Sequence, residues 1–192
     1  MSDFNKAFNI LMKLEFNSPK NALHKNKGEN GLTFMGIYQV AHPDLKIWEI
    51  ISQTIAMLYD SEKEEKELIS NVSVVLSQDN ELKEKVKQFY KKTFWDRAKL
   101  DCVNSQKICE EIFIFGVNVG MRNAIRKAQK LIGAIPDGIV GDQTIEALNC
   151  CQEDYFDMAF DEIEKRYYAD LISKRPSLSI FERGWNKRAD AV

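Results

Sequence analysis

The sequence predicts an all-α, mostly helical fold that leaves room for one small β-hairpin after the first helix. Charged and apolar residues recur with helical spacing over long stretches, and the 192-residue chain contains only four prolines and nine glycines. Hydrophobic residues make up 44% of the chain and aromatic residues 10%, which is enough for a substantial core. This length suits one ordinary domain, or one domain with a small appendage.

The first predicted helix spans Phe4–Glu15, and its last residue stands out. Phe4, Phe8 and Leu11 follow the i, i+4, i+7 spacing of an apolar helix face, and the next step of this spacing falls on a glutamate. Burial disfavours the charged form of a carboxyl group, which favours a proton donor. Two interpretations stay open: a buried acid, or a helix that ends before Glu15 and turns this side chain to water.

A long polar loop follows at residues 16–38 and is rich in Asn, Lys, Gly and Ser. Residues 32–40 alone have strand character, so the β-hairpin is expected there. Loops of this length in compact domains are usually functional or disordered. The loop contains Glu29 and Thr33, an acid and a hydroxyl that can assist Glu15 in breaking a glycosidic bond.

Several helices are predicted in the middle of the chain. Pro43 is expected to open the first of them, since proline is favoured in the first helical turn, and its apolar face runs to Leu58. The others are expected at residues 68–76, from Asp79 or Asn80 towards Trp95, from Gln106, and at 121–132. Gly116, Asn118 and Gly120 are expected to interrupt the helix from Gln106, because small residues indicate a close approach to a neighbour or a ligand.

The C-terminal part begins with a turn at residues 135–141, which has proline and glycine in turn positions. Asp142 is expected to cap the short helix Gln143–Leu148. A long helix is predicted at about residues 154–173. Five of its residues are expected to face inward: Phe156, Ala159, Ile163, Tyr167 and Leu171. Trp185 is expected to pack the C-terminus back onto the body.

Composition argues against several classes of protein. The formal net charge is −2 with 29% charged residues, so no nucleic-acid partner is expected. Four cysteines without a C-x-x-C pair and only two histidines predict reduced, mostly buried thiols, no metal site and no cofactor. The first residues lack the pattern of a secretory signal, and no segment approaches the ~18 apolar residues of a membrane span, so no membrane insertion is expected.

Six short motifs, in the family's order, resemble glycoside hydrolase family 108, the phage-type N-acetylmuramidases, with that family's C-terminal peptidoglycan-binding-type region. They are the helix that ends in Glu15, Gly31–Ile37 (G-x-T-x-x-G-I), the aromatic-Trp-Asp triplet Phe94–Asp96, Val117–Gly120 (V-N-x-G), residues 128–144 (A-Q-x … D-G-x-x-G-x-x-T) and residues 181–188 (F-x-R-G-W-x-x-R). The resemblance implies a lysozyme-like catalytic region at residues 1–120 and a helical peptidoglycan-binding-type region at 121–192 packed on it.

The activity that the resemblance implies is hydrolysis of the β-1,4 bond between N-acetylmuramic acid and N-acetylglucosamine in peptidoglycan, with Glu15 as general acid. The expected partners are peptidoglycan glycan strands. The expected protein is a monomer of the phage or prophage endolysin type, made in the cytoplasm without a signal peptide and acting on the cell wall after holin-type release. Two alternatives stay open: a degenerate protein that binds peptidoglycan without cutting it, and a purely structural helical protein.

Five further residues complete the predicted site. Glu29 is the acid nearest to the family's loop aspartate, and otherwise a solvated loop residue. Thr33 can orient a water or stabilise a turn. Tyr38 and Trp95 can stack on sugar faces or belong to the core. Asn118 can bind sugar hydroxyls through its amide, or cap between two helices.

The chain also departs from the family's pattern near the predicted acid. Phe16 and Asn17 stand where the family usually has Gly-Gly, and Ile114 stands where it often has an aspartate. Glycines after the acid would allow close approach of the backbone to substrate. A reshaped or narrower cleft, with weakened activity or a changed substrate, is therefore an open expectation.

Overall fold

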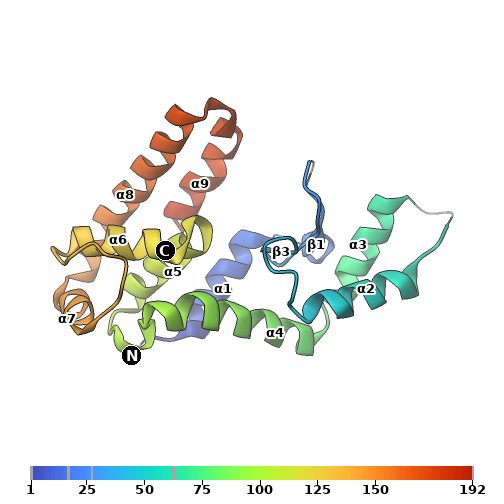
Figure 1. Ribbon diagram of the computed structural model, residues 1–192, viewed down its shortest axis with the longest axis horizontal. Coiled ribbons are helices and arrows are strands. Elements are labelled where there is room, and N and C mark those ends of the chain that lie inside the picture. Colours follow the sequence, from blue (N-terminus) through green and yellow to red (C-terminus); the bar gives the residue numbers. More distant parts are fainter. Residues whose placement is uncertain (1, 17, 27, 62–63, 192) are drawn as a thin grey trace. The chain divides into compact units, whose positions relative to one another are not determined.

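The computed structural model describes residues 2–16, 18–26, 28–61 and 64–191, and these residues form nine α-helices and one small antiparallel sheet (Figure 1). The prediction of a mostly helical fold is confirmed. The chain divides into two compact units, Leu11–Phe89 and Met1–Ile10 with Tyr90–Val192. In the described part of the chain, no helix combines the length and the apolar character that crossing a membrane requires.

Helix α1 (Phe4–Glu15) has the bounds that the sequence predicts. Its apolar face is buried at Phe4, Phe8 and Leu11, as the helical spacing requires. The helix contributes its first seven residues to one compact unit and its last five to the other. Glu15 is the last helical residue and is half-buried, so its side chain is neither fully enclosed nor fully open to water.

The unit Leu11–Phe89 contains a three-stranded antiparallel sheet of very short strands, β1 (Leu23–His24), β2 (Thr33–Phe34) and β3 (Ile37–Tyr38). The expected hairpin is confirmed as β2 and β3. They are joined by two residues with positive φ, Met35 at 47° and Gly36 at 83°, the geometry of a tight hairpin turn. Strand β1 was not predicted, because it lies outside residues 32–40, where the strand character of the loop is found.

The same unit contains α2 (Ile47–Leu58), α3 (Glu65–Leu76) and α4 (Asn80–Tyr90), the last of which ends one residue beyond it. The prediction that Pro43 opens α2 is wrong: Pro43 lies in the turn before this helix, where the Leu45 N–H donates to the His42 carbonyl at 3.4 Å. The prediction for α4 is confirmed, since the Asp79 carboxylate accepts a hydrogen bond from the Leu82 N–H at 3.0 Å and caps the helix.

In the other unit, a π-helical turn (Lys91–Trp95) and two short 3-10 turns lead to α5 (Gln106–Val119) and α6 (Met121–Leu131). The predicted interruption at Gly116 is wrong, because α5 continues to Val119 and ends before Gly120 at a φ of 88°. The expected close approach at Gly116 is confirmed: a Cβ there would lie 2.5 Å from Cε of Met121.

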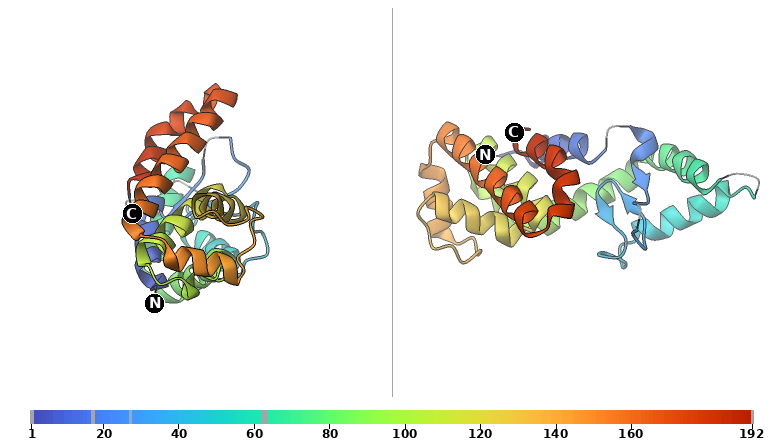
Figure 2. Two further views of the ribbon diagram at one scale, coloured as in Figure 1. Left: turned by 90° about the vertical axis from the view of Figure 1, so that its left-hand side faces the viewer. Right: turned by 90° about the horizontal axis from the view of Figure 1, so that it is seen from above.

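Helices α7 (Asp142–Cys150), α8 (Glu153–Lys174) and α9 (Glu182–Ala189) complete this unit, and α8 and α9 lie side by side (Figures 1 and 2). Asp142 is the first residue of α7, and Gly141 takes the capping position expected for Asp142. Trp185 stacks on Tyr168 with ring centroids 4.9 Å apart, which confirms that it packs α9 onto the body of the unit.

The inward face predicted for α8 is correct only at Phe156. The buried residues of α8 are spaced four apart: Phe156, Phe160, Glu164 and Tyr168. The other residues expected to face inward are half-buried. The prediction considered apolar residues alone and missed this buried row, because one of its members, Glu164, is a glutamate.

The four cysteines are free thiols in three different environments, so the expectation that most of them are buried is wrong. Cys109 is fully buried in α5, and burial raises the pKa of its thiol to about 12. Cys102 and Cys150 are exposed, and Cys151 is half-buried.

Candidate functional site

The unit Leu11–Phe89 contains four of the six residues that the sequence singles out: Glu15, Glu29, Thr33 and Tyr38. Glu15 ends α1 one helical turn beyond the fully buried Leu11. The residue as a whole is half-buried. A glutamate in this position can donate a proton to a glycosidic oxygen.

The hairpin brings Thr33 and Tyr38 together. They are direct partners across β2 and β3, and Thr33 is also the partner of His24 across β1 and β2. Thr33 is 8% exposed, whereas Tyr38 is half-buried. Tyr38 therefore keeps ring surface that a sugar could contact, while Thr33 is held inside the sheet.

Two glycines of the G-x-T-x-x-G-I segment explain why the hairpin forms at this place. Gly36 is the second residue of the turn with a positive φ, a backbone conformation that residues other than glycine rarely adopt. Gly31 is buried, and a Cβ there would lie 2.8 Å from Cγ2 of Val40, so a larger residue would push the hairpin ends apart.

Glu29 lies in a turn of its own within the loop. Its carboxylate accepts a hydrogen bond from the Asn26 side-chain amide at 3.1 Å, and its N–H donates to the Asn26 carbonyl at 3.1 Å. Gly28, at a φ of 86°, gives this turn its positive-φ residue. Glu29 is half-buried, and its role as a second acid for Glu15 stays a prediction.

Trp95 has no exposed ring face in this structure. It packs edge-to-face against Phe4 and Phe113, with centroids 5.4 and 5.8 Å away, and its indole N–H donates to the Asp101 carboxylate at 2.7 Å. Burial alone would raise the pKa of Asp101, but hydrogen bonds from Trp95 and Lys91 outweigh it and lower the pKa. These contacts match the core alternative for Trp95 rather than sugar stacking.

Asn118 is exposed near the end of α5, and its side-chain amide donates to the Tyr168 hydroxyl on α8 at 2.7 Å. The contact links two helices of one unit and is not the expected local cap, because Gly120 takes the position between α5 and α6 and no side chain caps α6 there. Its amide oxygen remains able to accept a hydrogen bond from a ligand.

The departures from the family's pattern have different structural settings. Phe16 is half-buried directly after α1, while Asn17 lies outside the described residues. Ile114 is 1% exposed and belongs to the core of α5. A carboxylate at this position would be enclosed by apolar neighbours, so this chain uses it for packing.

Sequence reasoning missed a group of acids between α5 and α8. Glu111 and Glu164 are 1% and 2% exposed, and Asp161 is half-buried beside them. Burial, followed by the nearby carboxylates of Glu164 and Asp161, raises the pKa of Glu111 to about 10. The sequence pattern gave a partial indication of this buried acid, because Glu111 lies between the inward-facing Ile108 and Ile112.

The D-G-x-x-G-x-x-T segment forms a loop organised by one buried side chain, Gln129 of α6. Its amide nitrogen donates to the Asp137 carboxylate and the Ile139 carbonyl, both at 2.9 Å, and its oxygen accepts from the Gly138 N–H at 2.8 Å. Hydrogen bonds from the Ile139 N–H and Gln129 lower the pKa of Asp137. Asp137 therefore fixes the turn, and the loop lines a surface pocket of about 350 Å³.

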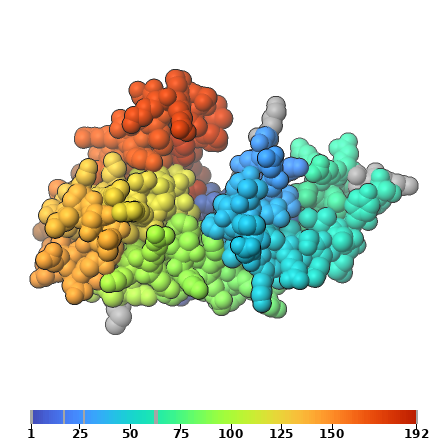
Figure 3. All heavy atoms as spheres, in the orientation of Figure 1, coloured from blue at the N-terminus to red at the C-terminus, as the bar shows by residue number. Residues whose placement is uncertain are grey.

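This loop lies at the surface between α6 and α7, in the yellow-to-orange part of the space-filling view (Figure 3). Ile135 and Ile139 project from it and are 73% and 65% exposed. Across residues 2–16, 18–26, 28–61 and 64–191, no group of three or more His, Cys, Asp or Glu side chains could hold a metal ion.

Comparison with known proteins agrees with this arrangement. The profile of the family described as "Glycosyl hydrolase 108" matches residues 22–120, about half of the chain, and the profile of "Predicted Peptidoglycan domain" matches residues 123–190. One similar solved structure is titled "Structure of Brucella abortus SagA" (TM-score 0.65, 19% identity, 97% of this chain and 89% of that chain covered). That likeness shows the fold alone. No match is found among the curated proteins.

Proposed function

Because this chain belongs to the glycosyl hydrolase 108 family, we propose that it cleaves the β-1,4 bond between N-acetylmuramic acid and N-acetylglucosamine in peptidoglycan. The family makes it a glycoside hydrolase, and the peptidoglycan-type region at residues 123–190 supports peptidoglycan as its substrate. The choice of bond and the identity of the acid are the proposed parts.

Glu15 is the proposed general acid. The family match begins at residue 22, after this glutamate, so its role rests on position. It continues the buried face of α1, ends the helix half-buried, and belongs to the same compact unit as the hairpin with Thr33 and Tyr38. This position is the observation that carries the proposal.

In the proposed reaction, the protonated Glu15 gives its proton to the glycosidic oxygen while the bond to the sugar's anomeric carbon breaks. The oxocarbenium character of that carbon then requires an anion or a water on its other side. Glu29 is the proposed second carboxylate, and Thr33 is the hydroxyl proposed to position a water. Tyr38 offers ring surface for a sugar face.

The test compares wild-type protein with Glu15→Gln on purified sacculi. Reduction of the released fragments with borohydride, followed by mass spectrometry, identifies which sugar carries the new reducing end. Reduced muramic acid is expected for wild type, and Glu15→Gln is expected to lower the rate at least about 100-fold with an unchanged unfolding midpoint.

Glu84→Gln, an exposed glutamate of α4 in the same unit, is the matched control and should cleave at the wild-type rate. Reduced glucosamine at the new ends would refute the proposed bond. A wild-type rate for Glu15→Gln would refute the proposed acid. Binding to sacculi without any release of reducing ends would identify a peptidoglycan-binding protein that does not cut.

A further inference from the structure

A pocket of about 370 Å³ lies in the unit Leu11–Phe89, where the short helix η1 (Pro19–Asn21) and strand β1 meet α3. One fully buried hydroxyl, that of Ser73 on α3, fixes its base. This hydroxyl donates to the Pro19 carbonyl at 2.5 Å and accepts from the Leu23 N–H at 2.9 Å. A single side chain thus ties both η1 and β1 to α3, so the pocket is already formed without a ligand.

The pocket has an apolar floor and a basic rim. Ile69 of α3 is half-buried and supplies the aliphatic surface, while Leu23 also lines the pocket but is only 1% exposed. Lys20, Lys25 and Lys66 supply three ammonium groups, and all three side chains are exposed to water. The three lysines come from η1, from the residue after β1 and from α3, so tertiary structure rather than a run of basic sequence gathers them.

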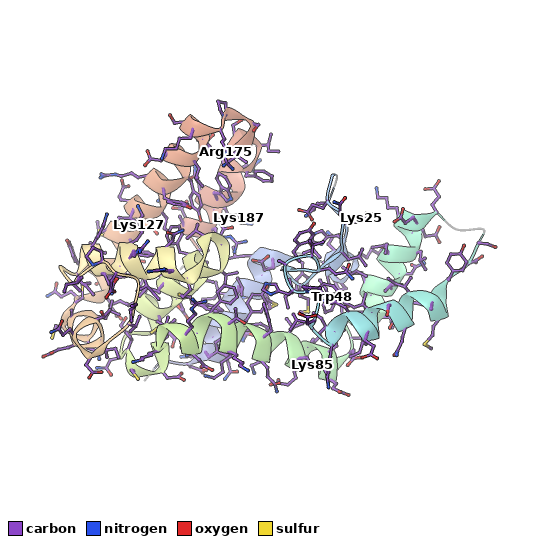
Figure 4. All side chains as sticks on the ribbon, in the orientation of Figure 1. Lys25, Trp48, Lys85, Lys127, Arg175 and Lys187 are labelled. Carbon is purple, nitrogen blue, oxygen red and sulfur yellow. The ribbon has the colours of Figure 1, made fainter. Side chains whose placement is uncertain are left out.

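Negative charge at the pocket is smaller than positive charge. Among the described residues that line it, Glu65 is the one acid, and its carboxylate lies 3.7 Å from the ammonium group of Lys25. Figure 4 labels the Lys25 side chain. His24 adds a polar ring, whose Nδ1 is 3.0 Å from the Asn21 carbonyl oxygen. Because the whole chain carries a net charge of −2, the positive charge here is a local feature and does not reflect a basic protein.

This chemistry suits an anion that is attached to a small aliphatic group. Neutral sugar rings are recognised by aromatic faces and by neutral hydrogen-bonding groups, which do not require several lysines. Carboxylates are recognised by cations, and a pocket of this volume accommodates a small ligand or a short peptide segment. In peptidoglycan, free carboxylates and alanine methyl groups occur together on the stem peptides, whereas the lactyl carboxyl of a peptide-bearing muramic acid is tied up in the amide bond to the first alanine.

We propose that this η1–β1–α3 pocket binds a carboxylate of a peptidoglycan stem peptide, with the adjoining methyl group on Ile69. Lys20 and Lys66 hold the carboxylate from η1 and α3. The inference rests on the proposed function, because it takes peptidoglycan as the substrate. It adds that the enzyme binds the stem peptide as well as the glycan and favours glycan strands that carry peptides.

The test uses two substrates: intact sacculi, and sacculi from which an N-acetylmuramoyl-L-alanine amidase has removed the stem peptides. The variant Lys20→Ala/Lys66→Ala is compared with Lys46→Ala/Lys83→Ala, which removes two charges from the same unit outside the pocket. The pocket variant is expected to raise KM on intact sacculi about three- to tenfold and to leave kcat unchanged. Stripping frees the lactyl carboxylate of each muramic acid, so a KM that is alike for all three proteins on stripped strands assigns the pocket to the stem peptide, as proposed, and a KM that stays raised for the pocket variant assigns it to the lactyl group.

An equal rise in the KM of the pocket variant on both substrates, or no rise on intact sacculi, would overturn the proposal. An effect that disappears when hydrofluoric acid has removed wall phosphate polymers would assign the lysines to phosphate and overturn it as well. A soluble stem tetrapeptide, followed by NMR, tests binding without catalysis. Shifts of the Leu23 and Ile69 amide signals, weakened in the pocket variant, are expected even if the chain cleaves a different bond, and their absence would refute the pocket alone.

Discussion

Glu111 of α5 and Glu164 of α8 bury two carboxyl groups where these two helices pack together. Burial comes first among the causes that raise both pKa values, to about 10 for Glu111 and about 8 for Glu164. The positive charges of Arg188 and Lys165 offset this only in part at Glu164. In the folded protein both groups therefore hold their protons at neutral pH.

This pair predicts that stability falls as the pH rises. Between the ordinary value of 4.5 and the folded pKa of about 10, folded Glu111 keeps a proton that the unfolded chain has lost. Each such proton lowers the free energy of unfolding by about 1.4 kcal/mol for every pH unit by which the pH rises. Stability is thus fully present below pH 4.5 and is lost progressively towards pH 10. Urea denaturation at pH 5, 7 and 9 measures this slope.

Glu111→Gln, which resembles the protonated acid, is expected to make the slope shallower and to stabilise the protein at pH 9. Glu162→Gln changes an exposed glutamate of α8 and should leave the slope unchanged. If Glu111→Gln follows the wild-type pH dependence, the buried carboxyl group does not hold its proton in the folded state.

Glu29→Gln tests the second carboxylate. The amide keeps the size of the side chain and its contact with Asn26 but removes the negative charge, so kcat on sacculi is expected to fall about 100-fold. The measurement is the initial rate of reducing-end release at saturating substrate. An unchanged kcat would exclude Glu29 from the mechanism and leave the role to a water positioned by Thr33.

Gly138→Ala is expected to destabilise the loop between α6 and α7 by about 2 kcal/mol. Gly138 has a φ of 79°, and a Cβ there would lie 3.1 Å from the Arg122 carbonyl oxygen. Gly133→Ala has a similar φ of 72° but no atom within 4 Å, so it isolates backbone strain and should cost about 1 kcal/mol. Equal unfolding free energies for the two variants would show that the contact with Arg122 contributes nothing.

Gln129→Met keeps the volume of the buried side chain and removes its hydrogen bonds. The Gly138 N–H and the Ile139 carbonyl then lose their partner, and a loss of about 2 kcal/mol is expected. Gln143→Met, at an exposed position of α7, should be nearly neutral. Denaturant unfolding measures both, and binding to sacculi shows whether an ordered loop is needed there.

The sequence predicted the helices well because helical periodicity is a local property. The bounds of α1 and the capping of α4 by Asp79 both follow from spacing and side-chain chemistry. Pro43 was placed wrongly because a proline fits a turn as well as a first helical turn. The inward face of α8 was shifted because Glu164 occupies an apolar register.

The candidate site was predictable only in outline. Position in α1 singled out Glu15, and the strand character of residues 32–40 marked the hairpin that pairs Thr33 with Tyr38. The burial of Trp95 depends on Phe4 and Phe113, which are far from it in sequence, so local patterns could not decide between core and ligand contact. The η1–β1–α3 pocket could not be predicted from local sequence patterns either, because its lysines come from separate elements.

The buried Cys109 gives the protein a natural reporter of its own unfolding. Thiol reagents attack the thiolate, and Cys109 combines full burial with a pKa of about 12, whereas Cys102 and Cys150 are exposed. A thiol-specific label should therefore react with the exposed cysteines within the mixing time of the experiment. It should react with Cys109 only when α5 separates from its neighbours. The labelling rate of this one sulfur reads out how often the core of its unit opens under native conditions.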